Sequence, residues 1–331
     1  MKEDHPKVTF GKTGILIINL GTPDSTNWWD IRKYLKEFLS DRRVIEVNPF
    51  VWQVILNLFI LTFRPSKTAK AYKEIWMNEV NKSPLRFYTE KQTEKLSDKF
   101  KKENLVIDFA MRYGNPSIKS KLHDLQKKGC EKIIILPLYP QYASPTTATV
   151  CDEVYRVLMK MRWQPAIQII PHYESEPMYI DALVKSIKKK LNSLDWSPNL
   201  IIASYHGIPK KYFEKGDPYH CYCQKTTRLL TEKFNQIKII TTFQSRFGPE
   251  EWLQPYTDKT LENLPKEGIK KILVICPGFA SDCVETLEEI SIQGKESFEK
   301  AGGEKFGLVP CLNDNDDHIN LIEYLIKKNL N

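Results

Sequence analysis

Residues 271–289, KILVICPGFASDCVETLEE, join an apolar run to an unusual density of carboxylates. The run at 271–276 is typical of a buried parallel strand, and a Pro-Gly loop then leads into a helix. Asp282, Glu285 and Glu289 follow one another at spacings of three and four, so they share one face of that helix. Open α/β sheets carry their chemistry where a strand ends and the next helix begins. The stretch therefore predicts a parallel α/β fold with a site for cations or protons here.

The same acids also have a purely structural interpretation. Asp282 and Glu285 have the spacing of a helix capping box, and acids in a first turn suit the helix dipole. A second stretch, SYHGIP at 204–209, favours the functional interpretation, because His206 ends another apolar run just before a glycine turn. The carboxyl ends of neighbouring parallel strands converge, so His206 is expected close to the acidic helix. A histidine and acids that meet in one cleft indicate proton transfer or metal binding.

Apolar runs alternate with helical patterns along the chain, which predicts two α/β units with parallel sheets. The expected strands lie at 14–20, 105–111, 132–137 and 166–170 in the first unit, and at 200–206, 237–243, 271–276 and 306–310 in the second. EGIKKILV at 267–274 repeats the pattern of KGCEKIII at 128–135, so two similar Rossmann-like units are expected to face a central cleft. The expected divisions are 1–165, 166–312 and a C-terminal segment, 313–331, whose helix packs back on the body.

The first copy carries an insertion at about 24–90, because the chain from Ile15 to Ile133 is much longer than the equivalent one from Ile201 to Ile272. This makes the inserted segment additional to the repeated unit.

The insertion contains PFVWQVILNLFILTF at 49–63, which is apolar nearly all round and is followed at once by Arg64 and Lys67. It is too short to span a bilayer, which takes about 20 apolar residues. One interpretation is a buried core helix. The other is a hydrophobic lip that grips a flat apolar ligand or rests on a membrane, with the basic residues at the headgroups. Because the repeated unit does not require the insertion, the lip is favoured.

Composition fits a globular protein of 331 residues and net charge +8. No basic block or aromatic–basic repeat indicates a nucleic-acid partner. The seven scattered cysteines indicate buried thiols and a reducing compartment, and the charged N-terminus has no apolar signal region. A cytoplasmic protein is therefore expected, with peripheral contact to the inner face of a membrane through 49–63 as an additional hypothesis; monomer and homodimer remain alternatives.

Seven short motifs together resemble ferrochelatases, the enzymes that insert ferrous iron into protoporphyrin IX to form protohaem. They are GTP at 21–23, MRY at 111–113, PLYPQY at 137–142, SYHGIP at 204–209, GDPY at 216–219, QSRFGP at 244–249 and GFASDCVETL at 278–287. The resemblance runs from about residue 14 to 314, and its motifs are specific in combination.

The resemblance implies a lyase with the site in the second unit. His206 would accept pyrrole protons, bind the metal, or both, and Glu285 would be its acidic partner and metal ligand, with Asp282 in support. The implied substrate-binding residues are Arg112, Tyr113, Tyr142 and Ser144. The lip would hold the porphyrin, and Glu289 and Gln293 would continue a proton or metal path.

The chain departs from the family pattern at two positions. An acid often stands where this chain has Gln293, and a histidine commonly stands where it has Cys283. No cofactor beyond the substrate iron is expected. A [2Fe–2S] cluster on Cys221 and Cys223 is the less favoured alternative, because such a cluster usually needs four thiolates.

Three other functions remain to be weighed. Iron insertion into coproporphyrin III, which carries four carboxylates, is a close rival, but a long apolar lip favours the less charged protoporphyrin. A two-lobed porphyrin or haem carrier would need the pocket without the proton acceptor. A dinucleotide-dependent oxidoreductase is disfavoured, since neither unit has G-x-G-x-x-G after its first strand.

Overall fold

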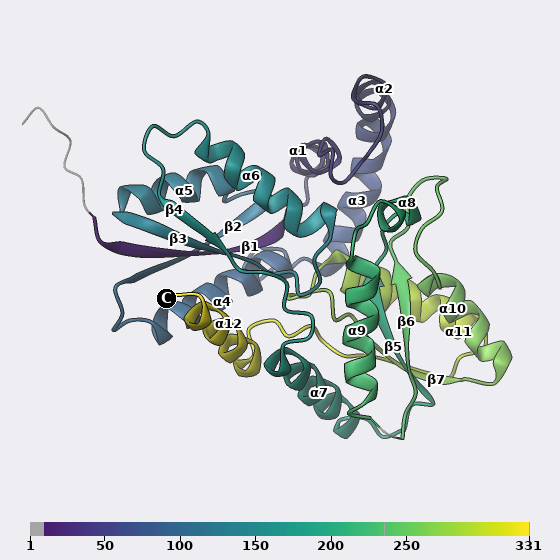
Figure 1. Cartoon of the computed structure of the whole chain (residues 1–331). Helices are drawn as coiled ribbons and strands as arrows, with labels where there is room; N and C mark the ends of the chain where they lie inside the picture. Colours follow the sequence, from purple (N-terminus) through teal and green to yellow (C-terminus); the bar gives the residue numbers. More distant parts are fainter. Residues whose placement is uncertain (1–9, 235, 331) are drawn as a thin grey trace, which may run out of the picture.

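The computed structural model describes residues 10–234 and 236–330, within which the chain forms two four-stranded parallel sheets (Figure 1). The first has the order β2-β1-β3-β4 and the second β6-β5-β7-β8. The strands are β1 Lys12–Thr22, β2 Leu105–Gly114, β3 Cys130–Pro137, β4 Ala166–Ile169, β5 Leu200–His206, β6 Ile239–Gln244, β7 Lys271–Ile275 and β8 Lys305–Leu308. The equivalent strand orders confirm the predicted pair of similar α/β units.

Helices lie on both faces of each sheet. They are α1 Trp28–Leu39, α2 Pro49–Ile55, α3 Leu61–Ile75, α4 Pro84–Lys99, α5 Ile118–Lys127, α6 Thr149–Leu158, α7 Pro177–Asn192, α8 Lys210–Glu214, α9 Tyr219–Thr231, α10 Thr257–Asn263, α11 Lys295–Lys300 and α12 Asp316–Lys328. Three further segments are π-helices, η1 Leu56–Ile60, η2 Ser144–Ala148 and η4 Glu285–Gly294, and η3 Leu264–Glu267 is a short 3-10 helix.

Alternation along the strands divides their apolar side chains between two cores. In β1, Leu16 and Ile18 face the outer core with α5 and α6, whereas Ile15 and Ile17 face a core that both sheets share. All four side chains are fully buried. Strands that are apolar on both faces are typical of parallel sheets covered by helices on each side.

One helix that follows each sheet in sequence packs against the other unit. Helix α7 follows the first sheet in sequence but packs on α9, and α12 follows the second sheet but packs on α4. The end of α12 reaches the first sheet, because Lys132 donates to the carbonyl of Leu330 and Gln168 donates to Asn329. In Figure 1, α12 lies beside α4, and α7 lies near α9. This packing makes the two units share one buried core.

The structure corrects two of the expected boundaries. Strand β4 pairs with β3, so the first sheet extends beyond residue 165 and the division falls after residue 169. The insertion is shorter than 24–90, because α4 covers β1 and β2 as the crossover helix of the first unit. The first correction agrees with the strand expected at 166–170 in the first unit, whereas the second rests on the packing of α4, which composition along the chain does not reveal.

The inserted lip consists of α1, α2, η1 and α3, and α2 stands out from the body in Figure 1. Its inner face has a small core that includes Tyr34, Leu56 and Tyr72. Its outer face is apolar and solvent-exposed, with Phe50 85% and Phe63 72% exposed. The buried-helix interpretation is therefore wrong, because the segment presents an exposed apolar face.

Polar caps fix where several helices begin. Asn27, Asn48, Ser83, Ser117 and Asn315 each accept a hydrogen bond from a backbone N–H of the first turn. A proline follows Asn48 and Ser83 directly, at the position where the missing N–H is harmless.

In the part of the chain that the structure describes, the helices are all too short or too polar to cross a bilayer. The seven cysteines are all free thiols. The expectation about the N-terminus concerns residues 1–9, which lie outside the described residues.

Candidate active site

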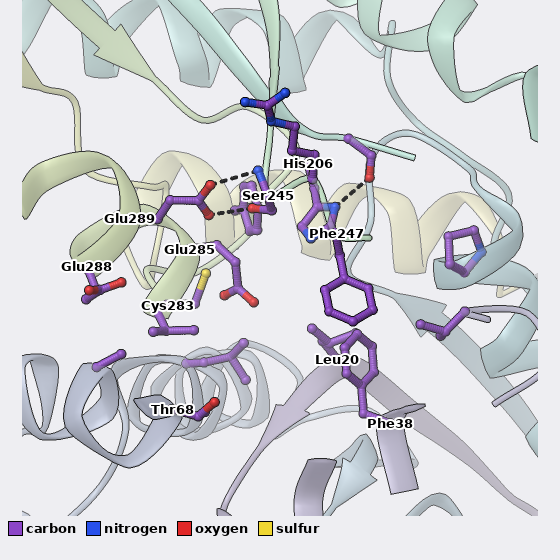
Figure 2. A pocket seen from close by; sticks show the side chains of 18 of the residues that line it. Leu20, Phe38, Thr68, His206, Ser245, Phe247, Cys283, Glu285, Glu288 and Glu289 are labelled. Carbon is purple, nitrogen blue, oxygen red and sulfur yellow. Dashed lines mark hydrogen bonds between the residues drawn. The ribbon is translucent and has the colours of Figure 1, made fainter. Parts of the chain in front are cut away.

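A cavity of about 1180 Å³ lies between the lip and the carboxyl ends of the strands. Its lining comes from the lip (Phe59, Ile60, Phe63, Arg64, Lys67), from the first unit (Leu20, Tyr139, Gln141) and from the second unit (His206, Ser245, Phe247, Cys283, Glu285, Glu288, Glu289). Figure 2 shows several of these side chains facing the same space. A large, mostly apolar cavity with a few converging polar groups is the usual form of a small-molecule site.

His206 ends β5 and stands opposite Gln244 in the neighbouring strand β6. Its Nδ1 lies 2.7 Å from the carbonyl oxygen of Gly207. A carbonyl can only accept, so Nδ1 carries the proton in this contact and Nε2 is left as the acceptor nitrogen of the neutral ring. Such an arrangement is the one by which a backbone carbonyl orients a metal-binding or proton-accepting imidazole.

Glu285 and Glu289 follow one face of η4, as predicted, although this helix is a ten-residue π-helix and Asp282 lies before it. Glu285, Glu288 and Glu289 all line the cavity. Figure 2 shows the Glu285 carboxylate turned into the cavity and that of Glu289 turned towards Ser245. π-Helical turns are rare and occur frequently at functional sites.

These acids and His206 form one electrostatic group. Burial raises the pKa of Glu289, hydrogen bonds from Ser245 and the nearby His206 lower it, and Glu285 raises it. Burial also raises the pKa of Glu288. The structure therefore brings His206 and Glu285 together at one cavity, as the sequence predicted.

Asp282 corrects the prediction. Its side chain lies outside the cavity lining and is 5% exposed. The carboxylate accepts hydrogen bonds from Thr286, from the backbone N–H of Cys311 and from Asn313, at 3.1, 3.2 and 2.7 Å. Asp282 therefore fixes the start of the acidic helix to the loop before α12, and the direct catalytic role expected for it is not supported.

Arg112 and Tyr113 also lie outside the lining. The guanidinium of Arg112 donates to Asp41 and to Thr149, and the Tyr113 hydroxyl donates to Asp41 at 2.9 Å. Tyr113 is fully buried in the small core of the lip. The end of β2 lies beneath α1, so these two residues hold the lip on the sheet, and their side chains do not face the cavity where substrate binding was expected.

Tyr142 and Ser144, the other two predicted substrate-binding residues, also lie outside the cavity lining. The backbone N–H of Ser144 donates to Asp217 at 2.6 Å, and the cavity is lined by its neighbours Pro145 and Thr146. The predicted loop is at the site, but these two side chains lie outside the lining.

Sequence reasoning missed the role of Arg64, which it assigned to membrane headgroups. Arg64 lines the cavity with its Cζ 4.5 Å from the centroid of the Phe247 ring. Its Nη1 is buried and has no hydrogen-bond partner among the described residues, and burial lowers its pKa. The sequence feature that could have indicated this place is the position of Arg64 directly after the apolar run at 49–63. Tyr139, another buried lining residue, has a hydroxyl that is likewise unpartnered within the described chain.

The two cysteines considered for a cluster differ in environment. Both lie on α9, where Cys221 is exposed and Cys223 is fully buried. Within residues 10–234 and 236–330, no group of three or more His, Cys, Asp or Glu side chains is placed to hold a metal ion.

Sequence comparison identifies the family. The sequence model of the family described as Ferrochelatase matches residues 12–330. The chain is 57% identical over 333 residues to a ferrochelatase of Allorhizobium ampelinum, covering 100% of this chain and 97% of that protein. It is 56% identical over 330 residues to a ferrochelatase of Rhizobium meliloti, covering 99% and 97%.

The chain belongs to the ferrochelatase family. It is therefore an enzyme of the lyase class.

Solved structures show the same chelatase-like fold for this ferrochelatase chain. SirB from Bacillus subtilis with Fe3+ matches with a TM-score of 0.57 at 14% identity, covering 96% of this chain and 95% of that one. CbiX, a terminal enzyme of sirohaem biosynthesis in denitrifying bacteria, matches with a TM-score of 0.54 at 12% identity, covering 96% and 100%. At this identity the likeness concerns the fold alone.

Both departures from the ferrochelatase pattern, Cys283 and Gln293, line the cavity, and Cys283 is the one beside Glu285. Figure 2 shows its sulfur next to that carboxylate. Burial raises the pKa of its thiol, and Glu285 raises it further. Cys283 therefore supplies a neutral thiol where a histidine is common in the family.

Proposed function

We propose that this member of the ferrochelatase family inserts Fe²⁺ into protoporphyrin IX and forms protohaem. The reaction exchanges one Fe²⁺ for the two pyrrole N–H protons, so it needs a proton acceptor and a ligand that guides the metal. The observation that carries the proposal is that His206 and Glu285 face one apolar-walled cavity from different elements.

His206 is proposed as the proton acceptor and as a ligand to the incoming iron. Its Nδ1 is tied to the Gly207 carbonyl, which supports Nε2 as the reacting nitrogen. Imidazole suits ferrous iron as a ligand, and its unprotonated nitrogen can accept a proton. Glu285 is proposed as the second ligand, since a carboxylate stabilises the cation while water is removed from it.

The cavity walls support a flat, mostly apolar substrate. Phe59, Ile60 and Phe63 on the lip and Leu20 on the opposite side would contact the macrocycle faces, releasing water from both surfaces. Arg64 has unused donor capacity and would meet a propionate, because guanidinium groups bind carboxylates bidentately.

The charges favour protoporphyrin over the more highly charged coproporphyrin III. Arg246 at the cavity already pairs with Asp258 at 2.7 Å, and Lys67 and Lys70 are exposed. Arg64 is thus the partly buried cation that supports binding of a propionate. A much faster turnover of coproporphyrin III than of protoporphyrin IX would contradict this choice.

The decisive experiment is anaerobic Fe²⁺ insertion into protoporphyrin IX by the wild type, His206→Ala and Glu285→Gln. Wild-type haem formation with a loss of about 10²-fold or more in both variants, at unchanged porphyrin binding, is the expected result. Tight porphyrin binding by a wild type that forms no haem would indicate a carrier. Wild-type rates in His206→Ala would contradict the assigned role.

We infer further that the enzyme needs no resident cofactor and that it contacts a membrane through the exposed apolar residues of the lip. The seven free thiols support a reducing, cytoplasmic compartment. Anaerobic reconstitution with iron and sulfide is expected to leave the protein without visible absorption. A stable cluster spectrum that is lost in Cys221→Ser would contradict the first inference.

A further inference from the structure

The backbone of Ser245, directly after β6, has a left-handed conformation. Its φ is 64°, in a region that residues other than glycine rarely adopt. Such a conformation persists where the surroundings hold it, and it occurs often at functional sites. What holds it here is visible in the contacts of the residue.

Both hydrogen-bond donors of Ser245, its backbone N–H and its hydroxyl, bind the Glu289 carboxylate. Its backbone N–H donates to Oε1 at 2.7 Å, and its hydroxyl donates to Oε2. Gln244 adds a third hydrogen bond, from Nε2 to Oε2 at 3.3 Å. Figure 2 shows the two bonds from Ser245 as dashed lines. Both carboxylate oxygens of Glu289 are therefore engaged by donors of the β6 end.

Gln244 connects this contact to both reacting residues. Its Nε2 also donates to the backbone carbonyl of Glu285 at 2.8 Å. It stands opposite His206 in the sheet, and its own carbonyl accepts from the N–H of Gly207 at 2.7 Å. The Gln244–Ser245 pair therefore joins the strand that carries His206 to the π-helix that carries Glu285.

π-Helices are rare and mostly limited to a single turn, so a ten-residue π-helix needs external support. Glu289 lies one turn after Glu285, and fixing it to β6 fixes the rotation of the helix about its axis. We propose that Glu289 is an anchor, not a proton carrier, and that Ser245 is the positioning residue that holds it so that Glu285 faces His206. This inference rests on the proposed iron insertion.

The test uses two pairs of variants. Ser245→Gly and Ser245→Asn both tolerate the left-handed backbone, but only asparagine offers a side-chain donor to Glu289. Glu289→Gln keeps the shape and much of the hydrogen bonding of the side chain but cannot take up a proton, whereas Glu289→Ala removes the anchor. Glu299→Gln, on the exposed face of α11 and paired with Lys295, is the matched control.

The measurements are kcat and KM for Fe²⁺ and protoporphyrin IX, with porphyrin binding followed by fluorescence. We expect Ser245→Gly to lower kcat about tenfold, which is the worth of one charge-assisted hydrogen bond, and Glu289→Ala to lower it at least as much because it removes all three bonds, both at an unchanged porphyrin KM. Ser245→Asn and Glu289→Gln should stay within about threefold of wild type. The double variant that combines Ser245→Gly with Glu289→Ala should be no slower than Glu289→Ala alone, because that substitution already removes the contact with the Ser245 hydroxyl.

An inactive Glu289→Gln beside a nearly normal Ser245→Gly would overturn the anchor and make Glu289 a proton carrier. Equal losses in Ser245→Gly and Ser245→Asn would overturn the role of the donor. Should Ser245→Gly fail to fold, Glu289→Gln decides alone. Failure of the wild type to form haem would concern the proposed function, whereas these ratios concern the positioning of Glu285.

Discussion

The guanidinium of Arg64 stacks on the ring of Phe247, with Cζ 4.5 Å from the ring centroid, although one residue belongs to the lip and the other to the second unit. The stack bridges the two sides of the cavity, and it leaves Nη1 of Arg64 buried and unpartnered within the described residues. A partly buried cation with an unused donor is stabilised by an anion beside it. The stack therefore supports the proposed binding of a substrate carboxylate by Arg64.

Replacement of Arg64 should affect substrate carboxylates and spare the chemistry. In Arg64→Met we expect the KM for protoporphyrin IX to rise about tenfold or more, since a charge-assisted hydrogen bond is lost, while kcat changes little. Steady-state kinetics with the dicarboxylate and its dimethyl ester checks this, because the ester should not distinguish the variant from the wild type. Arg228→Met, on the exposed side of α9, is the control. An equal loss for the ester would assign Arg64 a structural role.

The lip should separate into a substrate-contacting part and a membrane-contacting part. Phe63 lines the cavity, whereas the more exposed Phe50 lies outside the lining. We expect Phe50→Ser to weaken binding to anionic phospholipid vesicles several-fold with unchanged turnover, and Phe63→Ser to raise the porphyrin KM. Vesicle co-sedimentation and kinetics measure the two effects. Unaltered sedimentation of Phe50→Ser would refute the membrane contact at this residue.

Asp282 should matter mainly for stability. In Asp282→Ala, the Cys311 N–H and the Asn313 amide lose a buried acceptor, so the free energy of unfolding should fall by about 2–4 kcal/mol. Urea unfolding measures this loss, with the exposed Asp98→Ala as control. While folded, the variant should retain more activity than Glu285→Gln. Activity as low as that of Glu285→Gln in fully folded protein would restore a catalytic role.

Stability should depend on pH through His318 at the start of α12. Burial lowers its pKa from 6.5 to about 4, although the Asn313 carbonyl and Asp314 oppose the shift. The unfolded chain therefore binds more protons between about pH 4 and 6.5, so stability should rise with pH across that window and be complete above it. The contribution lost on acidification is on the order of 3 kcal/mol.

Unfolding midpoints measured from pH 4 to pH 7.5 check this dependence. His318→Gln should flatten the curve in that window, whereas His123→Gln, at a partly exposed position of α5, should leave it unchanged. A wild-type stability that does not vary between pH 4 and 6.5 would contradict a neutral, buried His318.

Local patterns were sufficient for much of the fold. The apolar runs predicted the strands, because a strand buried on both faces must be apolar throughout. The repeat of 128–135 at 267–274 predicted two like units, and the sheets have equivalent orders. His206 and Glu285 were also predictable together, since the ends of adjacent parallel strands converge on one cleft.

Side-chain direction was decided by tertiary structure. Arg112 and Tyr113 belong to a specific motif, yet both turn to Asp41 at the base of the lip. Asp282 shares the spacing of Glu285 and Glu289 but turns to Asn313, and Arg64 turns inward to Phe247. In each case the partner is remote in sequence. Helix and strand periodicity fixes which residues share a face, whereas the group opposite that face exists only once the chain has folded.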